Sequence, residues 1–293
     1  MRGKAWVGGE ILEISEATVP ATDHGLLYGD GVFEGIRIVH GGLFRLDRHL
    51  DRLEHGARVL DLRLPESRAR IREIVLETAR AFGEPEAYVR LLVTRGEGAM
   101  GVDPQSCPRA RIVCLATSIA LYPEAKLASG IDLVTSSWRR PQPDMLDPRV
   151  KSLNYLNSAM AKLEAKRAGA DEALLLNAAG NVAEAAVANL FALRDDVLLT
   201  PPGVDGALEG ITRASVIEIA EALGRRVEER SLSRFDLFAA SEVFLSGSGA
   251  AGLVPVRSLD GREIGEGRPG PVYAKLRDTL RDAAVDWVVP FAE

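Results

Sequence analysis

Cysteine is scarce in this chain of 293 residues. It has only two cysteines, Cys107 and Cys114, and their spacing suits neither a disulfide framework nor a metal site. Cys114 lies in the apolar run RIVCLAT, a pattern typical of a buried strand. Because disulfide frameworks belong to oxidising compartments, we expect a reducing, cytoplasmic location.

The chain also lacks an excess of positive charge and a long apolar run. A net charge of -6 argues against a phosphate-backbone partner, so we expect no binding to nucleic acid. No stretch approaches a membrane span, and the opening MRGKAWVGGE lacks the apolar core of a signal peptide. The composition, 46% hydrophobic and 27% charged, is that of a globular protein with one large domain or two modest ones and no membrane contact.

The first half of the chain alternates hairpin and helix patterns. Turn glycines between β-rich runs predict a hairpin in GVFEGIRIVHGGLFRL. Apolar positions that recur every three or four residues predict helices over 47–62 and 66–82. Apolar runs predict strands over 87–94 and 110–117.

A segment with turn residues and little apolar periodicity, 122–130, predicts a domain boundary. We therefore divide the chain into an N-terminal small domain (1–120), an interdomain linker (121–131) and a C-terminal domain (132–293). In the second domain, further helices are predicted over 212–223 and 271–284. The mixed order, with many hairpins and few βαβ units, predicts an α+β fold.

The Lys151 region also has a helical pattern. A helix ending near Gly169 is expected to turn one apolar face to the core, made by Leu153, Leu156, Met160 and Leu163.

Two glycine-rich segments could bind an anion. Residues 247–252, GSGAAG, match the dinucleotide motif GxGxxG, but LVPV follows where that fold needs a helix and a further βαβ unit. This loop is either an anion cradle or a plain turn. In LEGITR, 208–213, Thr212 opens an amphipathic helix whose N-terminus suits a phosphate, although ordinary capping explains the same residue.

Three charged residues have a functional and a plain interpretation. Arg52, in HLDRL, and Glu184, in NVAEAA, are either solvated or placed beside a partner of opposite charge. Lys151 stands out because only six of the 36 basic residues are lysines. It is either a solvated residue at a helix start or a desolvated nucleophile.

Together these residues supply a lysine nucleophile, a phenol (Tyr155), a carboxylate (Glu184) and two anion cradles. This set suits pyridoxal phosphate, an aldehyde cofactor with a cationic ring and a phosphate.

The sequence resembles the class IV, or fold-type IV, pyridoxal-phosphate aminotransferases over nearly its whole length. This family includes branched-chain amino acid aminotransferases, D-amino acid aminotransferases and aminodeoxychorismate lyase. The motifs that carry the resemblance are YGDGVFEGIR, HLDRL, AYVR, VKSLNYLNS, GADEALLLN, NVAEAAVANLF, LEGITR and DGREIGEGRPGPVYAKL.

The resemblance implies a two-domain α+β fold. A small N-terminal α/β sandwich-like domain is expected beside a larger C-terminal pseudo-barrel domain that binds the cofactor. The active site is expected between the domains of a homodimer or higher homo-oligomer, closed by a loop of the partner subunit.

The resemblance also implies a role for each candidate residue. Lys151 is the expected catalytic Schiff-base lysine, with Glu184 at the pyridine nitrogen and Tyr155 at the ring oxygen. The expected phosphate ligands are Arg52, Gly210, Ile211, Thr212 and Ser248. The expected substrate contacts are Tyr28, Phe33, Tyr88, Arg90, Gly249 and Ala250. No metal ligand is expected.

The preferred substrates follow from two further segments. YVR (88–90) and MGV (100–102) resemble the branched-chain enzymes, in which an arginine at the Arg90 position receives the side-chain carboxylate of glutamate. We therefore expect ping-pong transamination between an L-branched-chain amino acid and 2-oxoglutarate. The alternatives are a D-amino acid aminotransferase, an aminodeoxychorismate lyase, which the neutral Ala188 resembles, and a non-catalytic binder of a phosphorylated ligand. The last would lack the lysine or the carboxylate, and both are present.

Overall fold

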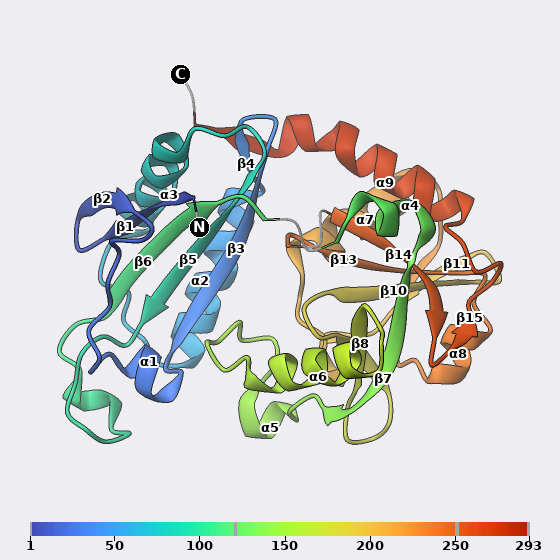
Figure 1. Ribbon diagram of the computed structural model, residues 1–293, viewed down its shortest axis with the longest axis horizontal. Helices are drawn as coiled ribbons and strands as arrows, with labels where there is room; N and C mark the ends of the chain where they lie inside the picture. Colours follow the sequence, from blue (N-terminus) through green and yellow to red (C-terminus); the bar gives the residue numbers. More distant parts are fainter. Residues whose placement is uncertain (1, 120–121, 250–251, 292–293) are drawn as a thin grey trace. The chain divides into compact units, whose positions relative to one another are not determined.

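The computed structural model describes residues 2–119, 122–249 and 252–291 (Figure 1). The chain forms two compact units. The first consists of Met1–Ile119, Val150–Asn154 and Ala284–Glu293, and the second consists of Ala120–Arg149 and Tyr155–Ala283. The short segment that carries Lys151 therefore belongs to the first unit, although the chain on both sides of it belongs to the second.

The first unit is built on a seven-stranded antiparallel sheet in the order β16-β4-β3-β5-β6-β1-β2. Its strands are β1 (Gly3–Val7), β2 (Glu10–Glu13), β3 (Gly31–Val39), β4 (Gly42–Phe44), β5 (Ala87–Thr94), β6 (Arg111–Thr117) and β16 (Val288–Pro290). Its helices are α1 (His24–Tyr28), α2 (Leu46–Val59), α3 (Arg68–Phe82) and the short 3-10 turns η1 (Pro104–Ser106) and η3 (Ala284–Trp287).

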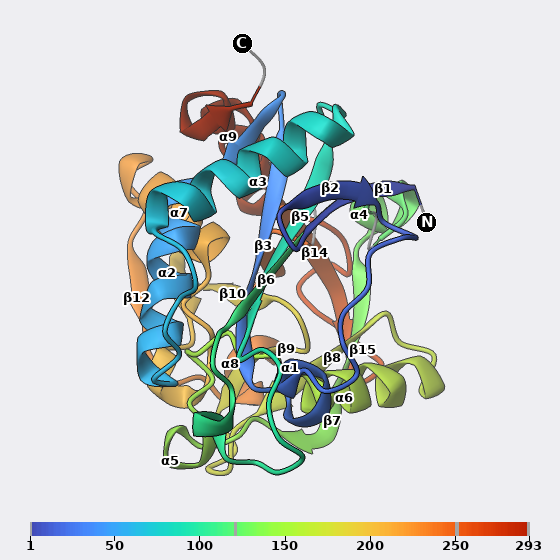
Figure 2. The same ribbon diagram turned by 90° about the vertical axis from the view of Figure 1, so that its left-hand side faces the viewer.

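Helices α2 and α3 cover one face of this sheet (Figure 2). Side chains alternate between the two faces of a strand, so Val32, Ile36 and Ile38 of β3 join the core with the helices. Phe33 and Gly35 consequently lie on the other face of β3. This alternation separates a packed apolar side from a side that can present functional groups.

The helix and strand predictions for this unit are largely confirmed. Strand β5 has the predicted bounds, and α2 and α3 lie within a few residues of theirs. Helix α3 starts where Ser67 accepts a hydrogen bond from the Arg70 amide, as an N-cap does, and it ends at Gly83 in the left-handed conformation.

The second unit is built on a nine-stranded mixed sheet in the order β12-β11-β10-β13-β14-β7-β8-β9, with β15 paired to β14. Its strands are β7 (Ile131–Arg139), β8 (Glu172–Leu176), β9 (Val182–Ala185), β10 (Asn189–Arg194), β11 (Val197–Thr200), β12 (Val227–Glu229), β13 (Glu242–Gly247), β14 (Gly252–Leu259) and β15 (Arg262–Glu263). Strands β13 and β14 pair antiparallel, which agrees with the rejection of a dinucleotide fold at the GxGxxG match.

Helices pack against this sheet from several directions (Figure 1). They are α4 (Glu124–Ser129), α5 (Pro143–Leu146), α6 (Leu156–Arg167), α7 (Ile211–Ala222), α8 (Arg234–Phe238), α9 (Pro271–Ala283) and the 3-10 turn η2 (Gly203–Asp205). Helix α6 packs on β7 and β8, whereas α7 and α9 contact each other and β13. Helix α4 lies in the segment predicted as a linker, of which residues 120 and 121 are outside the described residues. No helix in the described part of the chain is long and apolar enough to cross a lipid bilayer.

The predicted apolar face of the helix after Lys151 is wrong. Helix α6 starts at Leu156, so Lys151 precedes it by more than one turn, and Leu156 and Leu163 are 74% and 39% exposed. The buried positions are instead small: Ala161 and Ala165 pack against Ala173 on β8. Small side chains let a helix approach a sheet closely, and a search for large apolar residues cannot detect such a face.

Candidate active site

Lys151 lies at an edge of the first unit's sheet. The Phe33 amide donates a hydrogen bond to the Lys151 carbonyl, and the Leu153 amide donates to the Gly31 carbonyl, each at 2.9 Å. The amine nitrogen of Lys151 is 4.5 Å from the centroid of the Phe33 ring. Strand β3 therefore fixes the lysine backbone, and an aromatic ring supports its side chain.

Two further predicted substrate residues gather around the same ring. The Arg90 guanidinium carbon lies 4.8 Å from the centroid of the Phe33 ring, and the Arg90 Nη2 donates a hydrogen bond to the Tyr88 hydroxyl at 3.2 Å. Gly35 makes this arrangement possible, since a β-carbon there would overlap the Tyr88 hydroxyl. The structure thus brings together Lys151, Phe33, Tyr88 and Arg90 on one side of the sheet.

Tyr28, another predicted substrate residue, ends helix α1. Its ring meets the buried His24 edge-on, with the ring centroids 4.9 Å apart. The neighbouring Gly29 carbonyl accepts a hydrogen bond from the Asn154 side-chain amide at 2.9 Å. The end of α1 is therefore tied to the segment that carries Lys151.

Arg52, a predicted phosphate ligand, is held by a buried carboxylate. From α2, its Nε and Nη2 donate hydrogen bonds to the two oxygens of Glu34 on β3, at 2.8 and 2.7 Å. His49, one turn earlier on α2, places its Nδ1 at 2.7 Å from Glu34 Oε2. Both Glu34 and His49 are fully buried.

Glu34 keeps its charge despite its burial. Burial alone would raise its pKa, but the Arg52 charge and hydrogen bonds, together with His49, lower the pKa of Glu34 to about 2. Our sequence analysis missed this residue. The signal was available in GVFEGIRIV, where a carboxylate occupies the apolar row of Val32 and Ile36 at a spacing of two.

In the second unit, Glu184 is buried and fully partnered, so its interpretation as a surface residue is wrong. Glu184, on β9, is 5% exposed. Its Oε1 lies 2.6 Å from Arg140 Nη2. Its Oε2 accepts hydrogen bonds from the Asn189 side-chain amide at 2.9 Å and from the Leu208 backbone amide at 3.1 Å. The carboxylate is thus oriented by three donors from three separate segments.

Sequence reasoning missed Arg140 and Asn189. Arg140 follows β7 and is only 8% exposed, with further hydrogen bonds to the Gly206 carbonyl and the Ser158 hydroxyl. The proline-rich loop around Arg140 gave no sign of burial. Asn189 gave a weak sign, because it is a polar residue at the start of the apolar strand NLFAL.

The N-terminus of α7 collects the predicted phosphate ligands of the second unit. Gly210 is the N-cap, and Ile211 and Thr212 occupy the first turn, where backbone amides lack partners within the helix. The Thr212 and Ser248 hydroxyl oxygens are 3.5 Å apart, so the two glycine-rich segments of the sequence meet here.

The remaining predicted residues can be placed more briefly. Tyr155 is the N-cap residue of α6. Gly249 follows Ser248 in the turn after β13, and Ala250 lies outside the described residues.

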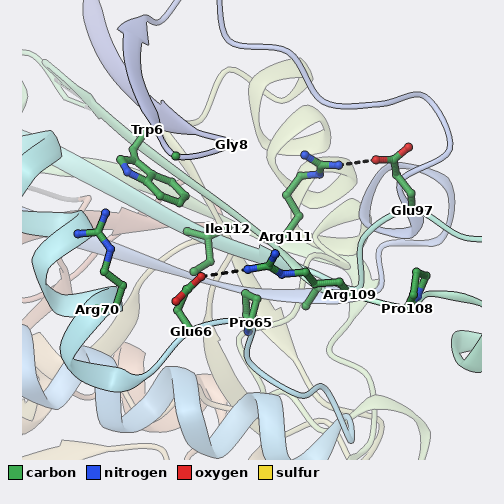
Figure 3. Close-up of a pocket in the computed structure, with 12 residues that line it drawn as sticks. Trp6, Gly8, Pro65, Glu66, Arg70, Glu97, Pro108, Arg109, Arg111 and Ile112 are labelled. Atoms are coloured by element: carbon green, nitrogen blue, oxygen red, sulfur yellow. Dashed lines mark hydrogen bonds and ion pairs between the residues drawn. The ribbon is translucent and has the colours of Figure 1, made fainter.

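A surface cavity of about 550 Å³ on the first unit contains none of the predicted site residues (Figure 3). Trp6 of β1 and Arg70 of α3 contribute to its wall. Its arginines are neutralised locally, because Arg109 pairs with Glu66 at 3.1 Å and Arg111 pairs with Glu97 at 2.6 Å (Figure 3). We therefore assign the chemistry to the two groups around Lys151 and Glu184.

Comparison with known proteins agrees with this assignment. Residues 31–259 match the family described as Amino-transferase class IV. The chain belongs to the class IV aminotransferases. A putative branched-chain-amino-acid aminotransferase of Methanocaldococcus jannaschii is 43% identical to this aminotransferase over 97% of both chains. The branched-chain-amino-acid aminotransferase of Escherichia coli K12 is 38% identical over 94% of this chain and 91% of its own.

Solved structures extend the similarity to the fold. A branched-chain amino acid aminotransferase solved with pyridoxamine 5′-phosphate, from the source abbreviated T.th., superposes with a TM-score of 0.93 at 37% identity, covering 100% of this chain and 99% of its own. The branched-chain aminotransferase of Thermoproteus uzoniensis with norvaline has a TM-score of 0.91 at 35% identity, covering 99% of each chain. The predicted two-domain α+β fold of type IV is confirmed.

Class IV aminotransferases use pyridoxal 5′-phosphate, and the residues of this enzyme fit that cofactor. A buried carboxylate oriented by an arginine, as in Glu184, suits a protonated pyridine nitrogen. The N-terminus of α7 with the Thr212 and Ser248 hydroxyls suits a phosphate. Lys151 supplies the amine that binds the aldehyde carbon. The enzyme is a pyridoxal-phosphate-dependent aminotransferase.

Replacing Gly210 with alanine is expected to weaken cofactor binding about 10- to 100-fold, the loss of a hydrogen bond to a charged group. A β-carbon at Gly210 would overlap the side-chain oxygen of Asn189 and push its amide away from Glu184. The backbone at Gly210 has φ -69°, so alanine adds no backbone strain there. Titration of the apoenzyme with pyridoxal phosphate, followed by absorbance, measures the effect.

Two comparisons isolate the cause of this effect. Gly101→Ala, where a β-carbon meets nothing within 4 Å, should leave cofactor affinity unchanged. Gly210→Ala in an Asn189→Ala background should add little, because the displaced group is already absent. Full additivity of the two substitutions would contradict the role of Asn189.

Proposed function

We propose that this aminotransferase exchanges an amino group between L-branched-chain amino acids and 2-oxoglutarate in a ping-pong cycle. Relatives of 36–43% identity that cover most of the chain are named branched-chain-amino-acid aminotransferases. A structural neighbour with the same fold was solved with norvaline, an unbranched aliphatic amino acid. These similarities support an aliphatic substrate.

The contact between Arg90 and Phe33 carries the proposal. A ring with a guanidinium 4.8 Å from its centre offers both an apolar surface and a fixed positive charge. The ring suits an aliphatic side chain, and the guanidinium suits the side-chain carboxylate of glutamate or 2-oxoglutarate. A pocket that must accept both substrates in alternate half-reactions needs this combination.

Lys151 is the proposed catalytic residue. It holds the cofactor through its amine until the donor amino acid displaces it. The neutral amine then takes the proton from the substrate α-carbon and returns it to the cofactor carbon. When bound, the cofactor supplies an electron sink that stabilises the charge left on the α-carbon.

The other proposed roles are to orient and hold the cofactor. Glu184, oriented by Arg140, faces the pyridine nitrogen, and Tyr155 bonds the ring oxygen. The phosphate is held by Arg52 and by the first turn of α7 with Ser248, in the geometry that helix N-termini offer to anions.

We also propose a cytoplasmic homodimer. Met100 and Val102 are each 79% exposed on one loop, and large exposed apolar side chains of this kind mark interaction surfaces. A partner subunit that covers this loop would bury both. Sedimentation of the purified holoenzyme at the dimer mass supports this proposal, and a monomer at micromolar concentration contradicts it.

A panel of amino donors tests the substrate proposal. We expect turnover with L-leucine, L-isoleucine, L-valine and L-glutamate, each with the matching 2-oxo acid acceptor, and none with D-alanine. Faster turnover with D-alanine than with L-leucine, or release of pyruvate from aminodeoxychorismate, would overturn the proposal in favour of the other family activities.

Replacing Arg90 with methionine is expected to separate the two substrate classes. The variant keeps an apolar side chain against Phe33 but loses the charge, so KM for 2-oxoglutarate should rise about 10- to 100-fold, as for a lost charge-assisted hydrogen bond. The half-reaction with L-leucine should change by less than about threefold, since its aliphatic side chain gains no charge-assisted bond from Arg90. Stopped-flow absorbance measures each half-reaction separately. Arg70→Met, on α3, is the control, and an equal loss with both substrates would refute the role of Arg90.

A further inference from the structure

Glu34 is a charged residue in an otherwise apolar row. Strand β3 turns Val32, Glu34, Ile36 and Ile38 toward α2, and the three aliphatic side chains are buried in the core of the first unit. Glu34 itself is 0% exposed. Burying an ion pair usually contributes less stability than packing apolar residues in the same space. A carboxylate here is therefore a costly way to fill the core, and its geometry suggests another purpose.

The geometry fixes the guanidinium of Arg52. Nε and Nη2, which form one edge of the planar group, both donate to the Glu34 carboxylate. This two-bond fork sets the plane of the guanidinium as well as its position. The opposite edge, with Nη1, points away from Glu34. The side chain of Arg52 is 13% exposed, so it reaches the margin of the core while its orientation is set from inside.

His49 fixes the carboxylate in turn. Burial lowers the pKa of His49 against the opposing pull of Glu34, and the Arg52 and Lys151 charges lower it further. A neutral imidazole beside an ionised carboxylate must carry its proton on Nδ1, where it donates to Glu34 Oε2. Its Nε2 is buried and has no hydrogen-bond partner among the described residues. The three side chains form a chain of orientation from His49 through Glu34 to Arg52.

We propose that Glu34 and His49 are positioning residues that aim Arg52 at the phosphate of the cofactor. The inference rests on the proposed role of Arg52 as a phosphate ligand. The two residues touch neither substrate nor cofactor. They act by holding one edge of the guanidinium so that the other edge meets the phosphate without losing side-chain entropy on binding.

The alternative is that Arg52 serves only to neutralise Glu34. In that case the loss of Glu34 would alter folding stability and would affect every ligand of the enzyme alike. Positioning of Arg52 makes a narrower demand, because only a ligand with a phosphate should sense it. Pyridoxal, which has the same ring and aldehyde but no phosphate, separates the two explanations.

The test is the affinity of the Glu34→Gln apoenzyme for pyridoxal phosphate and for pyridoxal, measured by absorbance titration. Glutamine keeps the shape of the side chain but loses the charge and one of the two acceptors for Arg52. We expect pyridoxal phosphate to bind about 10- to 100-fold more weakly, and pyridoxal to change by less than about threefold. Glu172→Gln is the matched control, since Glu172 is equally buried and pairs with Lys162 at 2.7 Å. It should leave both affinities unchanged.

The outcomes separate the inference from the role of Arg52. An Arg52→Met variant should show the same phosphate-selective loss, and Glu34→Gln should add nothing to it. If Arg52→Met has this loss and Glu34→Gln does not, the positioning role is wrong while Arg52 remains a phosphate ligand. If neither variant discriminates the two ligands, the role of Arg52 fails as well. Equal weakening of both ligands by Glu34→Gln also overturns the proposal.

A second variant covers a failure of Glu34→Gln to fold. His49→Gln keeps the Glu34–Arg52 pair but removes the imidazole that orients Oε2. It should show a smaller loss, about three- to tenfold, again for pyridoxal phosphate alone. Unchanged affinity for pyridoxal phosphate in a folded His49→Gln protein would remove His49 from the proposal.

Discussion

Replacing Lys151 with alanine is expected to lower the transamination rate by about 10⁴-fold or more, because both the nucleophile and the general base are lost. The protein should still fold, since the segment is fixed on β3 by backbone hydrogen bonds that alanine retains. The cofactor should still bind through its phosphate and ring, without the absorbance band of the lysine-bound form. Single-turnover absorbance with L-leucine measures the loss.

The matched control is Lys166→Ala, on an exposed position of α6 in the same stretch of sequence. It should transaminate at the wild-type rate. Added methylamine should restore part of the activity of Lys151→Ala, because a small amine can replace the missing base. Near-normal transamination by Lys151→Ala without added amine would refute the assigned role.

Replacing Glu184 with glutamine is expected to lower kcat by about 10²- to 10³-fold, as for other preorganised electrostatic contacts. The carboxylate is the group that stabilises a protonated pyridine nitrogen, and an amide cannot supply that charge. The substitution also leaves Arg140, 8% exposed, without its counter-charge, so thermal stability should fall. The cofactor absorbance maximum of the variant should shift as the ring loses its proton.

Stability and chemistry are separated by Glu172→Gln, which breaks another buried ion pair in the same unit. Both variants should melt at lower temperature, but only Glu184→Gln should lose kcat and change the cofactor spectrum. An unchanged spectrum in Glu184→Gln, with activity reduced only in proportion to stability, would contradict the role of Glu184.

Local patterns predicted the elements of this fold well. Apolar runs bounded by turns predicted β5, and a Ser–Gly pair of caps frames α3 near its predicted bounds. The pattern failed at α6, where alanines at Ala161 and Ala165 make the buried face. Periodicity detects large apolar side chains, whereas packing of a helix on a sheet depends on the distance that small ones permit. The return of 150–154 to the first unit is a long-range contact that no local pattern encodes.

The candidate site divides in the same way. Residues within a motif, such as Lys151 and Glu184, could be predicted from the sequence. Their partners could not, because Arg140 and Asn189 reach Glu184 from separate segments of the second unit. Glu34 was visible in principle, as a carboxylate at an apolar position of a strand. Partners of this kind are selected by the tertiary fold, and sequence spacing carries no record of them.

Reduction of the holoenzyme with borohydride, followed by peptide mapping, tests the central claim most directly. Borohydride fixes the cofactor irreversibly to the lysine that holds it. After trypsin digestion we expect the pyridoxyl group on a peptide covering 150–162, with no cleavage at the modified Lys151. Prior conversion with L-leucine should abolish the labelling. Label on another lysine, such as Lys126 or Lys275, would contradict the account.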